Sequence, residues 1–366
     1  MDHRFTGPDY TIGIEEELMI LDAGGHDLAN AMEELLGDSD AGEIKPELHE
    51  SVLEIATKPC ANVSEAGGQL RALRTQVRER AAAKGLAIAS AGTHPYSKWE
   101  DQRISGRERY RDLIADLRWV ARQELIFGLH THVGIEDPET AIHVANGMRV
   151  HVPILLALSA NSPFFRGEDT GLASARTPVF RQFPRIGIPP RYDGWADYER
   201  RMAFMVESGA IKDHTWLWYD VRIHPAFGTV EIRACDAQTR VEHTLALSAL
   251  TQAMVRELAE HHRSGGELQD YPHEMLEENK WLAARHGLEG ELVDLPSTAR
   301  VPARALAERL LERLRPHAQD LGAADALDGL RDILDNGNGA VRQRKVYEAN
   351  HDFGELVRDL VDASGG

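Results

Sequence analysis

The stretch Thr215–Asp236 constrains the fold most, because polar and apolar side chains alternate along it on both sides of a short turn, Pro225–Gly228. Alternation with a period of two on either side of a turn is the pattern of a β-hairpin. One face of the predicted hairpin is apolar. The other face carries charged side chains, those of Asp220, Arg222, Glu231 and Arg233. A charged face of this kind can simply meet water, so the hairpin alone does not predict a functional site.

A second predicted strand, Thr11–Leu21, places carboxylates on a similar face. Side chains alternate along a strand, so Glu15 and Glu17 share one face, while Glu16 lies on the opposite face among apolar residues. A strand edge in water would explain three consecutive glutamates, but this run lies within an apolar, β-favouring segment. Carboxylates this close on a half-buried strand repel one another unless cations lie between them. The strand therefore indicates a site that binds positive charge.

A third predicted strand, Leu48–Ala56, adds further acidic groups. An extended backbone puts Glu50 and Glu54 on one face, and Glu47 stands at the entrance of the strand. Each of these acidic patterns is weak alone. Three strands that each present carboxylates on one face together favour a cation site on the polar side of a sheet.

Paired histidines lie on a fourth predicted strand, Leu129–Ile135, where His130 and His132 project to the same side. Carboxylate-rich sites suit Mg²⁺ or Mn²⁺, which bind through a few carboxylates together with substrate phosphates. Zinc fits less well, because neither cysteine lies at ligand spacing and a His-x-His pair is short of a full ligand set. The strands therefore predict a metal–phosphate site.

The sequence contains neither of the common Gly-rich phosphate-binding motifs, the P-loop and the Rossmann fingerprint. Arginines recur instead in the irregular segment Asn161–Tyr192 and after the loop Asp335–Gly339. Arginine forks suit phosphate and carboxylate groups, although a single arginine most often forms a surface ion pair. An aromatic side chain such as Trp218 could stack on a substrate, but on a strand it more often packs against a neighbour. The candidates for nucleotide or substrate binding are His130, Arg176, Arg185, Arg222, Arg342, Arg344 and Trp218.

Composition excludes some classes of function. The formal net charge of −18 argues against a general nucleic-acid-binding protein, whose phosphate contacts need a basic surface. Two cysteines cannot form a disulfide framework in 366 residues, and no apolar run is long enough to cross a membrane. The N-terminus lacks the basic and apolar regions of a signal peptide. We therefore expect a cytoplasmic protein without a membrane partner, and the sequence leaves a homo-oligomer open.

The order of the predicted elements favours an α+β or mixed α/β fold, of which we expect α+β, built as one domain over residues 1–366. Strands lie early and in the middle of the chain, including a short one at Leu86–Ala91, and the part from about residue 241 is mainly helical. No internal repeat or linker divides the sequence. The predicted helices span residues 65–84, 107–127, 137–160, 241–263, 302–315 and 340–363.

Several of these motifs resemble the carboxylate–amine ligase family, often called type 2 glutamate–cysteine ligases. The resemblance begins with Thr11–Leu18, Lys45–Thr57 and His130–Ile135. It continues through residues 159–165, 169–174, 184–190, 215–222 and 228–233, so that it covers about residues 10 to 350. One departure is Phe165, where the family pattern has Trp, and this change is conservative.

The resemblance implies a fold similar to glutamine synthetase and glutamate–cysteine ligase, in which a curved antiparallel sheet cradles ATP, metal ions and glutamate. It implies Mg²⁺ (or Mn²⁺) ligands at matching positions, namely Glu15, Glu17, Glu47, Glu54 and Glu231, with His132 near the nucleotide or a metal. It also implies a catalytic role for Glu231 and for Arg233, which matches the active-site arginine near the transferring phosphate.

The resemblance further implies a reaction, in which ATP activates the γ-carboxylate of glutamate as an acyl phosphate and an amine displaces the phosphate. Cysteine is the favoured amine. Another amino acid, a polyamine, or a peptide or carrier-bound amine stays open, because the sequence shows no motif for the acceptor pocket. A non-catalytic ligand-binding protein on the same scaffold is a third possibility, against which the retained carboxylates and Arg233 argue.

Overall fold

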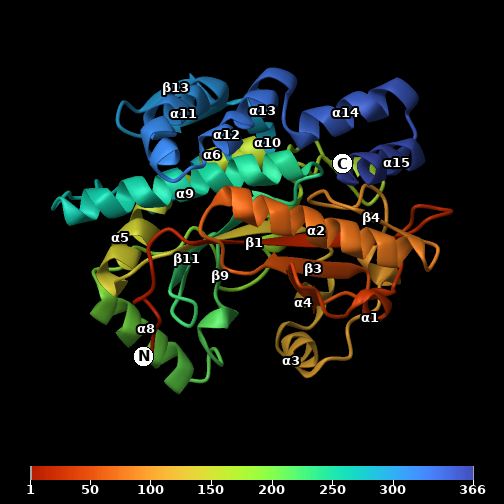
Figure 1. Ribbon diagram of the computed structural model, residues 1–366, viewed down its shortest axis with the longest axis horizontal. Coiled ribbons are helices and arrows are strands. Elements are labelled where there is room, and N and C mark those ends of the chain that lie inside the picture. The colour runs from red at the N-terminus through yellow and green to blue at the C-terminus, as the bar shows by residue number, and fades with distance from the viewer. Residues whose placement is uncertain (1, 366) are drawn as a thin grey trace.

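The computed structural model describes residues 2–365, and the centre of the molecule is a seven-stranded sheet (Figure 1). Its strand order is β10-β11-β5-β1-β3-β2, with β4 also paired to β1, and each pairing is antiparallel. The strands are β1 (Ile12–Asp22), β2 (Gly42–Pro46), β3 (Val52–Thr57), β4 (Leu86–Ala89), β5 (Gly128–Gly134), β10 (Val221–His224) and β11 (Thr229–Asp236). The predicted antiparallel sheet is therefore confirmed.

Three two-stranded ribbons lie outside this sheet. They pair β6 (Phe164–Phe165) with β7 (Glu168–Asp169), β8 (Ile186–Gly187) with β9 (Trp218–Tyr219), and β12 (Glu291–Asp294) with β13 (Ala299–Pro302).

Helices surround the sheet, and they dominate the chain after residue 241. In the first half they are α1 (Met32–Leu35), α2 (Val63–Ala82), α3 (Glu108–Leu117), α4 (Trp119–Arg122), α5 (Pro138–Met148), α6 (Val152–Ser159), α7 (Arg176–Phe180) and α8 (Trp195–Glu207). The others are α9 (Val241–Arg263), α10 (His273–His286), α11 (Ala303–Asp320), α12 (Ala324–Asp328), α13 (Leu330–Asn336), α14 (Gly339–Asn350) and α15 (Phe353–Ser364). An α+β fold with an antiparallel sheet and surrounding helices agrees with the sequence prediction.

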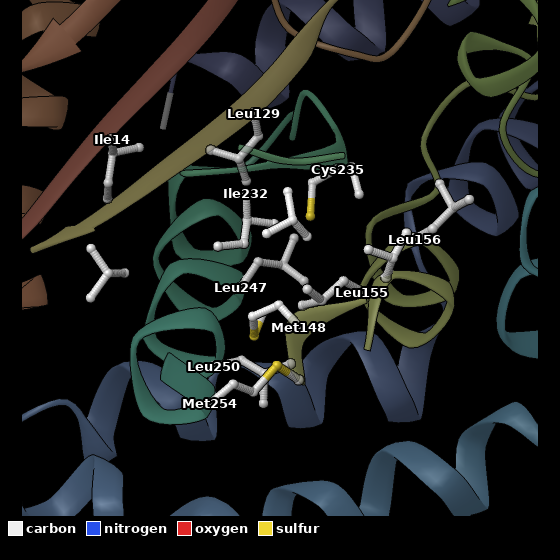
Figure 2. Close-up of a cluster of buried hydrophobic side chains, with 14 of the residues drawn as sticks. Ile14, Leu129, Met148, Leu155, Leu156, Ile232, Cys235, Leu247, Leu250 and Met254 are labelled. Atoms are coloured by element: carbon white, nitrogen blue, oxygen red, sulfur yellow. The ribbon is translucent and has the colours of Figure 1, made fainter. Parts of the chain in front are cut away.

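The apolar face of the sheet packs against α2, α6 and α9, and the C-terminal helices α11 to α13 lie beyond α9 (Figure 1). Figure 2 shows how strand side chains meet helix side chains in this layer. The buried residues labelled there are Ile14, Leu129, Ile232 and Cys235 from the strands and Met148, Leu155, Leu156, Leu247, Leu250 and Met254 from the helices. The core thus fixes the sheet on one side and leaves its polar side free to form a site.

The charge of Glu16 is neutralised in this helical layer. Its fully buried carboxylate forms an ion pair with the guanidinium group of Arg74 from α2. The two groups form a bidentate pair, with Nε–Oε2 at 2.8 Å and Nη2–Oε1 at 2.9 Å. Thr244 of α9 also donates to this carboxylate, and Arg74 donates to the backbone carbonyls of Gln238 and Thr239 at 2.7 Å. The opposite-facing glutamate therefore ties β1 to two helices and to the segment after β11.

Three predicted helices are broken in the structure. The helix predicted for residues 107–127 ends at Arg122 and is interrupted at Arg118, whose φ of 55° is left-handed. The helix predicted for residues 137–160 is the pair α5 and α6, bent by 62°. The region predicted as residues 340–363 divides at His351, which has a φ of 51°.

The predicted positions of Glu50 and Asp220 on the polar face were wrong, because neither residue lies within a strand. β3 begins only at Val52, and Glu50 in the preceding turn points to Arg103, with Oε2–Nε at 2.8 Å. Asp220 lies between β9 and β10, and its buried carboxylate accepts a 2.6 Å hydrogen bond from Lys280 of α10. Neither carboxylate belongs to the polar face.

Among residues 2–365, no single helix is long and apolar enough to cross a membrane. The bent pair α5 and α6 reaches the required length and apolarity only when the two helices are taken together.

The Glu16–Arg74 pair gives a stability prediction. Replacement of Arg74 by Met leaves the buried carboxylate of Glu16 without its cation, so we expect the free energy of unfolding to fall by about 3–5 kcal/mol. Arg71→Met is the matched control one turn earlier on α2. Its pair with Glu242 is 49% and 59% exposed, so we expect a loss below about 1 kcal/mol. Equal urea midpoints for the two variants would contradict this role of Arg74.

Candidate active site

The strand registers bring the polar side chains of the sheet together. Glu15 of β1 stands opposite His130 of β5, and Glu17 stands opposite Glu54 of β3. Directly opposed side chains in antiparallel strands have Cβ atoms about 4.5–5.5 Å apart. Because adjacent strands alternate in phase, residues distant in sequence become neighbours on one face.

The hairpin β10–β11 contributes the other end of this face. Glu231 stands opposite His132 on one side and opposite Arg222 on the other. Arg233 reaches the same carboxylate from two positions farther along β11. The predicted catalytic pair, Glu231 and Arg233, therefore forms an ion pair within the sheet.

All six predicted metal ligands fall into three overlapping groups, in each of which the potential ligand atoms lie within 4.8 Å of one another. The groups are Glu15, His132 and Glu231; Glu15, Glu54 and His130; and Glu17, Glu47 and Glu54. Glu15 and Glu54 each belong to two groups. His130, predicted from sequence to contact nucleotide or substrate, joins the ligand-compatible groups.

The chemistry of these donors fits hard divalent cations. Carboxylate oxygens predominate, as Mg²⁺ and Mn²⁺ prefer. His132 Nδ1 shares a 3.0 Å hydrogen bond with the hydroxyl of Thr229, while its Nε2 is buried and has no hydrogen-bond partner. A ring held through one nitrogen with the other left free is the usual arrangement of a metal-binding histidine.

The protonation of the carboxylates differs along the face. Burial and then the charges of Glu17 and Glu54 hold the pKa of Glu47 well above its usual range, and burial and Glu15 raise the pKa of Glu54 to about 8. Burial opposes ionisation of Glu231 too, but Arg222 and Arg233 outweigh it and hold its pKa well below the usual range. The end of the face at Glu47 therefore lacks enough positive charge to balance its carboxylates. At the other end, Arg222 and Arg233 balance the charge of Glu231.

Lys45 supplies a cation that the sequence analysis missed. Its Nζ lies 3.2 Å from both Glu15 and Glu54. The β2–β3 register places Lys45 directly opposite Glu54. The sequence did contain a signal for this position, because Lys45 and Glu47 alternate around Pro46 as side chains on one face of a strand do. Lys45 partly neutralises the middle of the polar face.

A cavity of about 270 Å³ opens on this face. The sheet forms its floor, and its walls come from α3, the segment before β5 and residues 215–218. The polar wall residues that were not singled out from the sequence include His49, Arg109, Tyr110 and Glu124. Arg109, Tyr110 and Glu124 all fall in the helix predicted across residues 107–127, but Glu124 lies in the irregular segment between α4 and β5.

The predicted nucleotide- and substrate-binding residues divide into three sets. His130, Arg222 and Trp218 line the cavity. Arg176 donates a hydrogen bond to the backbone carbonyl of Arg233 at 3.2 Å. Arg185 stacks on Trp218, with 5.3 Å between the guanidinium carbon and the ring centroid. Both arginines therefore contact residues that line the cavity without lining it themselves.

Arg342 and Arg344 do not line the cavity. Arg342 forms an ion pair with Asp332, and Arg344 pairs with Asp169 at 2.9 Å. Their guanidinium groups join the C-terminal helices to neighbouring segments instead. The structure thus places both predicted nucleotide- or substrate-binding arginines outside the described cavity.

Comparison with known proteins identifies the family. The model of the glutamate–cysteine ligase family 2 (GCS2) matches residues 11–363. The chain belongs to this family. A Rubrobacter xylanophilus member provisionally named glutamate–cysteine ligase 2-1 is 45% identical over 367 residues, covering 100% of this chain and 97% of the relative. A Solibacter usitatus member with a similar provisional name is 40% identical, covering 97% of this chain and 93% of the relative.

Solved structures show the same fold. The glutamate–cysteine ligase of Francisella tularensis, solved in complex with AMP, superposes with a TM-score of 0.73 at 14% identity, covering 100% of this chain and 89% of that chain. A bifunctional glutathione synthetase from Pasteurella multocida gives a TM-score of 0.69 at 14% identity, covering 97% of this chain and 53% of that chain. The family and fold predicted from the sequence motifs are confirmed, and this GCS2 chain is a carboxylate–amine ligase.

The raised pKa of Glu54 gives a pH prediction for this GCS2 protein. In EDTA, the folded protein retains a proton on Glu54 up to about pH 8, whereas the ordinary carboxyl pKa is 4.5. This contribution to stability is complete below about pH 4.5 and is lost as the pH rises through about 8. We expect the thermal midpoint to fall across this window, and Glu54→Gln to fall less steeply.

Glu15 and Glu231 do not mask this effect, because their lowered pKa values act below the ordinary carboxyl range. Scanning calorimetry at several pH values measures the slope for both proteins. Parallel slopes for the parent and Glu54→Gln would show that Glu54 ionises normally in the folded state.

Proposed function

We propose that the protein uses ATP to join the γ-carboxylate of glutamate to an amine, with cysteine as the favoured acceptor. The observation that carries the proposal is the set of three overlapping ligand-compatible groups beside Arg222 and Arg233 on the polar face of the sheet. Five of the seven residues in these groups also line one cavity. Catalysis of phosphoryl transfer depends mainly on positioning the reactants and on stabilising the phosphate charge with cations. Metal-compatible groups next to two arginines can meet both requirements. The AMP bound to the structurally similar Francisella ligase supports ATP as the nucleotide.

The metal groups fit Mg²⁺ or Mn²⁺. Glu17, Glu47 and Glu54 would hold a cation at one end of the face, and Glu15, His132 and Glu231 would hold one at the other end. A bound divalent cation supplies charge stabilisation for phosphate oxygens. The raised pKa values of Glu47 and Glu54 mark where added positive charge would be most favourable.

In the first step, an oxygen of the γ-carboxylate attacks the γ-phosphorus of ATP, the bond to the bridging oxygen breaks, and ADP leaves. Glutamate then carries an acyl phosphate. Arg233 is placed to stabilise the transferring group, because its Nε is buried without a partner while Nη1 holds Glu231. The same guanidinium group is therefore anchored and still has a donor to offer.

In the second step, the amine attacks the acyl carbon and its nitrogen loses a proton to solvent. The tetrahedral intermediate then collapses, and phosphate leaves with the electrons of the broken C–O bond. Trp216, Trp218 and Tyr110 border the cavity and limit the access of water to the acyl phosphate. The acyl phosphate is itself activated, so the mechanism requires no nucleophilic side chain.

An assay of ADP, phosphate and product mass with Mg²⁺, ATP, glutamate and a panel of amines tests the proposal. We expect ADP formation that depends on both glutamate and an amine, with γ-glutamylcysteine as the product from cysteine. Another active amine would preserve the mechanism and change the acceptor. No turnover with any amine, or full activity in EDTA, would contradict the proposed function.

Two glutamates of one motif provide a matched pair. Glu54→Gln removes a carboxylate shared by two ligand groups, so we expect kcat/KM to fall by about 100-fold or more, because charge stabilisation is lost. Glu50→Gln removes a carboxylate that pairs with Arg103 outside the cavity, so we expect a change of less than about twofold. Similar losses in both variants would argue against the assignment of the polar face.

A further inference from the structure

Glu124 is a carboxylate of the cavity wall that the proposed reaction has not yet used. It lies between α4 and β5, in the segment where the predicted helix breaks. Within residues 2–365 its side chain has no hydrogen bond and no ion pair, and it belongs to none of the three ligand groups. Burial and then the charge of Glu17 raise its pKa well above the usual range. A charged ligand of opposite sign would remove this penalty.

His49 is a second unsatisfied group on the wall of the same cavity. Its side chain lies in a residue that is 1% exposed, and neither ring nitrogen has a hydrogen-bond partner. Buried polar atoms are nearly always paired, so the His49 imidazole beside the cavity is open to hydrogen bonds with a bound polar molecule. The two ring nitrogens can serve as one donor and one acceptor when the ring is neutral.

Three of the four cationic side chains that line the cavity have carboxylate partners. Lys45 lies between Glu15 and Glu54, and both Arg222 and Arg233 pair with Glu231. The fourth, Arg109, is exposed and donates to the hydroxyl of Thr215 at 3.2 Å, and none of the four forms an ion pair with Glu124 within residues 2–365. The charges of Arg233 and Arg176 lower the pKa of Glu124 by less than burial and Glu17 raise it. The missing partner is positively charged and small enough to share the cavity with a nucleotide.

Apolar side chains also line the cavity. Leu48, Val52, Leu113 and Ile126 line the cavity together with the aromatic ring of Tyr110. Limited contact with water strengthens an ion pair between a carboxylate and a ligand ammonium group. An amino acid offers such an ammonium group next to a carboxylate, and its other polar atoms can pair with an imidazole.

We propose that Glu124 binds the α-ammonium group of an amino-acid substrate and that His49 hydrogen-bonds to the same molecule. The inference rests on the proposed function, since it assigns a subsite within that cavity. The ammonium group belongs to the donor glutamate or to the acceptor amino acid, and both present the same chemistry to Glu124. Glu124 is thereby a specificity-determining residue for substrates that carry an α-amino group.

Calorimetric titration in Mg²⁺ and a non-hydrolysable ATP analogue tests the subsite without turnover. Glutamate is compared with glutarate, which lacks the ammonium group, and cysteine is compared with 3-mercaptopropionate for the same reason. We expect the parent to bind at least one amino acid about tenfold or more tightly than its deaminated analogue. Glu124→Gln should abolish that preference, and the affected pair identifies the substrate bound.

Two further variants sharpen the test. His49→Phe keeps a ring and removes both nitrogens, so we expect weaker binding of the same amino acid and of its deaminated analogue. Glu108→Gln is the matched control, because this exposed α3 glutamate does not line the cavity, and we expect parental affinities. If Glu124→Gln does not fold by calorimetry, Glu124→Asp replaces it and should weaken the preference.

An unchanged preference in the Glu124 variant would overturn the proposal, as would a parent that shows no preference. A selective loss of Mg²⁺–nucleotide affinity in Glu124→Gln would also overturn it, because Glu124 would then be a metal ligand. ADP formation by the parent separates the two hypotheses. An active parent whose variant keeps the preference refutes the subsite alone, and an inactive parent whose variant loses the preference refutes the ligase reaction alone.

Discussion

Repulsion among carboxylates on one face of the sheet is the constraint on which the rest of the site depends. Strand register brings Glu15, Glu17 and Glu54 to neighbouring positions, and Glu47 and Glu231 extend the same face. Three cationic side chains, Lys45, Arg222 and Arg233, neutralise part of this charge. Their distribution is uneven, so the Glu47 end keeps carboxyls that resist ionisation while the Glu231 end does not. Added cations would relieve the remaining repulsion on this face, and the proposed phosphate transfer would use the same positive charge.

The opposite face of the same sheet supplies the rigidity that such a site requires. Along β1, each step of one residue changes the side of the sheet, so Glu16 enters the helical layer while its neighbours enter the cavity. Arg74 neutralises it and also holds the backbone that follows β11. The position of the catalytic hairpin is thereby coupled to α2. Buried apolar contacts between the strands and α9 keep the sheet in place beneath the cavity (Figure 2).

Periodicity made the strands predictable, because a period of two determines which side chains share a face. It placed six of the seven metal-compatible residues on the polar face, namely Glu15, Glu17, Glu54, His130, His132 and Glu231. It did not predict where strands stop. Glu50 and Asp220 have the correct parity, yet local breaks in the backbone turn them toward Arg103 and Lys280. Glu124 was hidden for a related reason, since a left-handed residue within an apparently continuous helix has no clear signal in one sequence. Family resemblance added the ligand roles. Arg342 and Arg344 show that cations after a Gly-rich loop can pair with acidic side chains outside the cavity.

The most direct test of the central claim is a crystal structure with Mn²⁺ and a non-hydrolysable ATP analogue, with metal positions taken from anomalous scattering. The account predicts manganese peaks among Glu15, Glu54 and Glu231 and their partners in the three ligand groups, with phosphate oxygens completing the coordination. Arg233 should lie against the terminal phosphate. Manganese bound elsewhere, with the polar face of the sheet free of metal and nucleotide, would contradict the account.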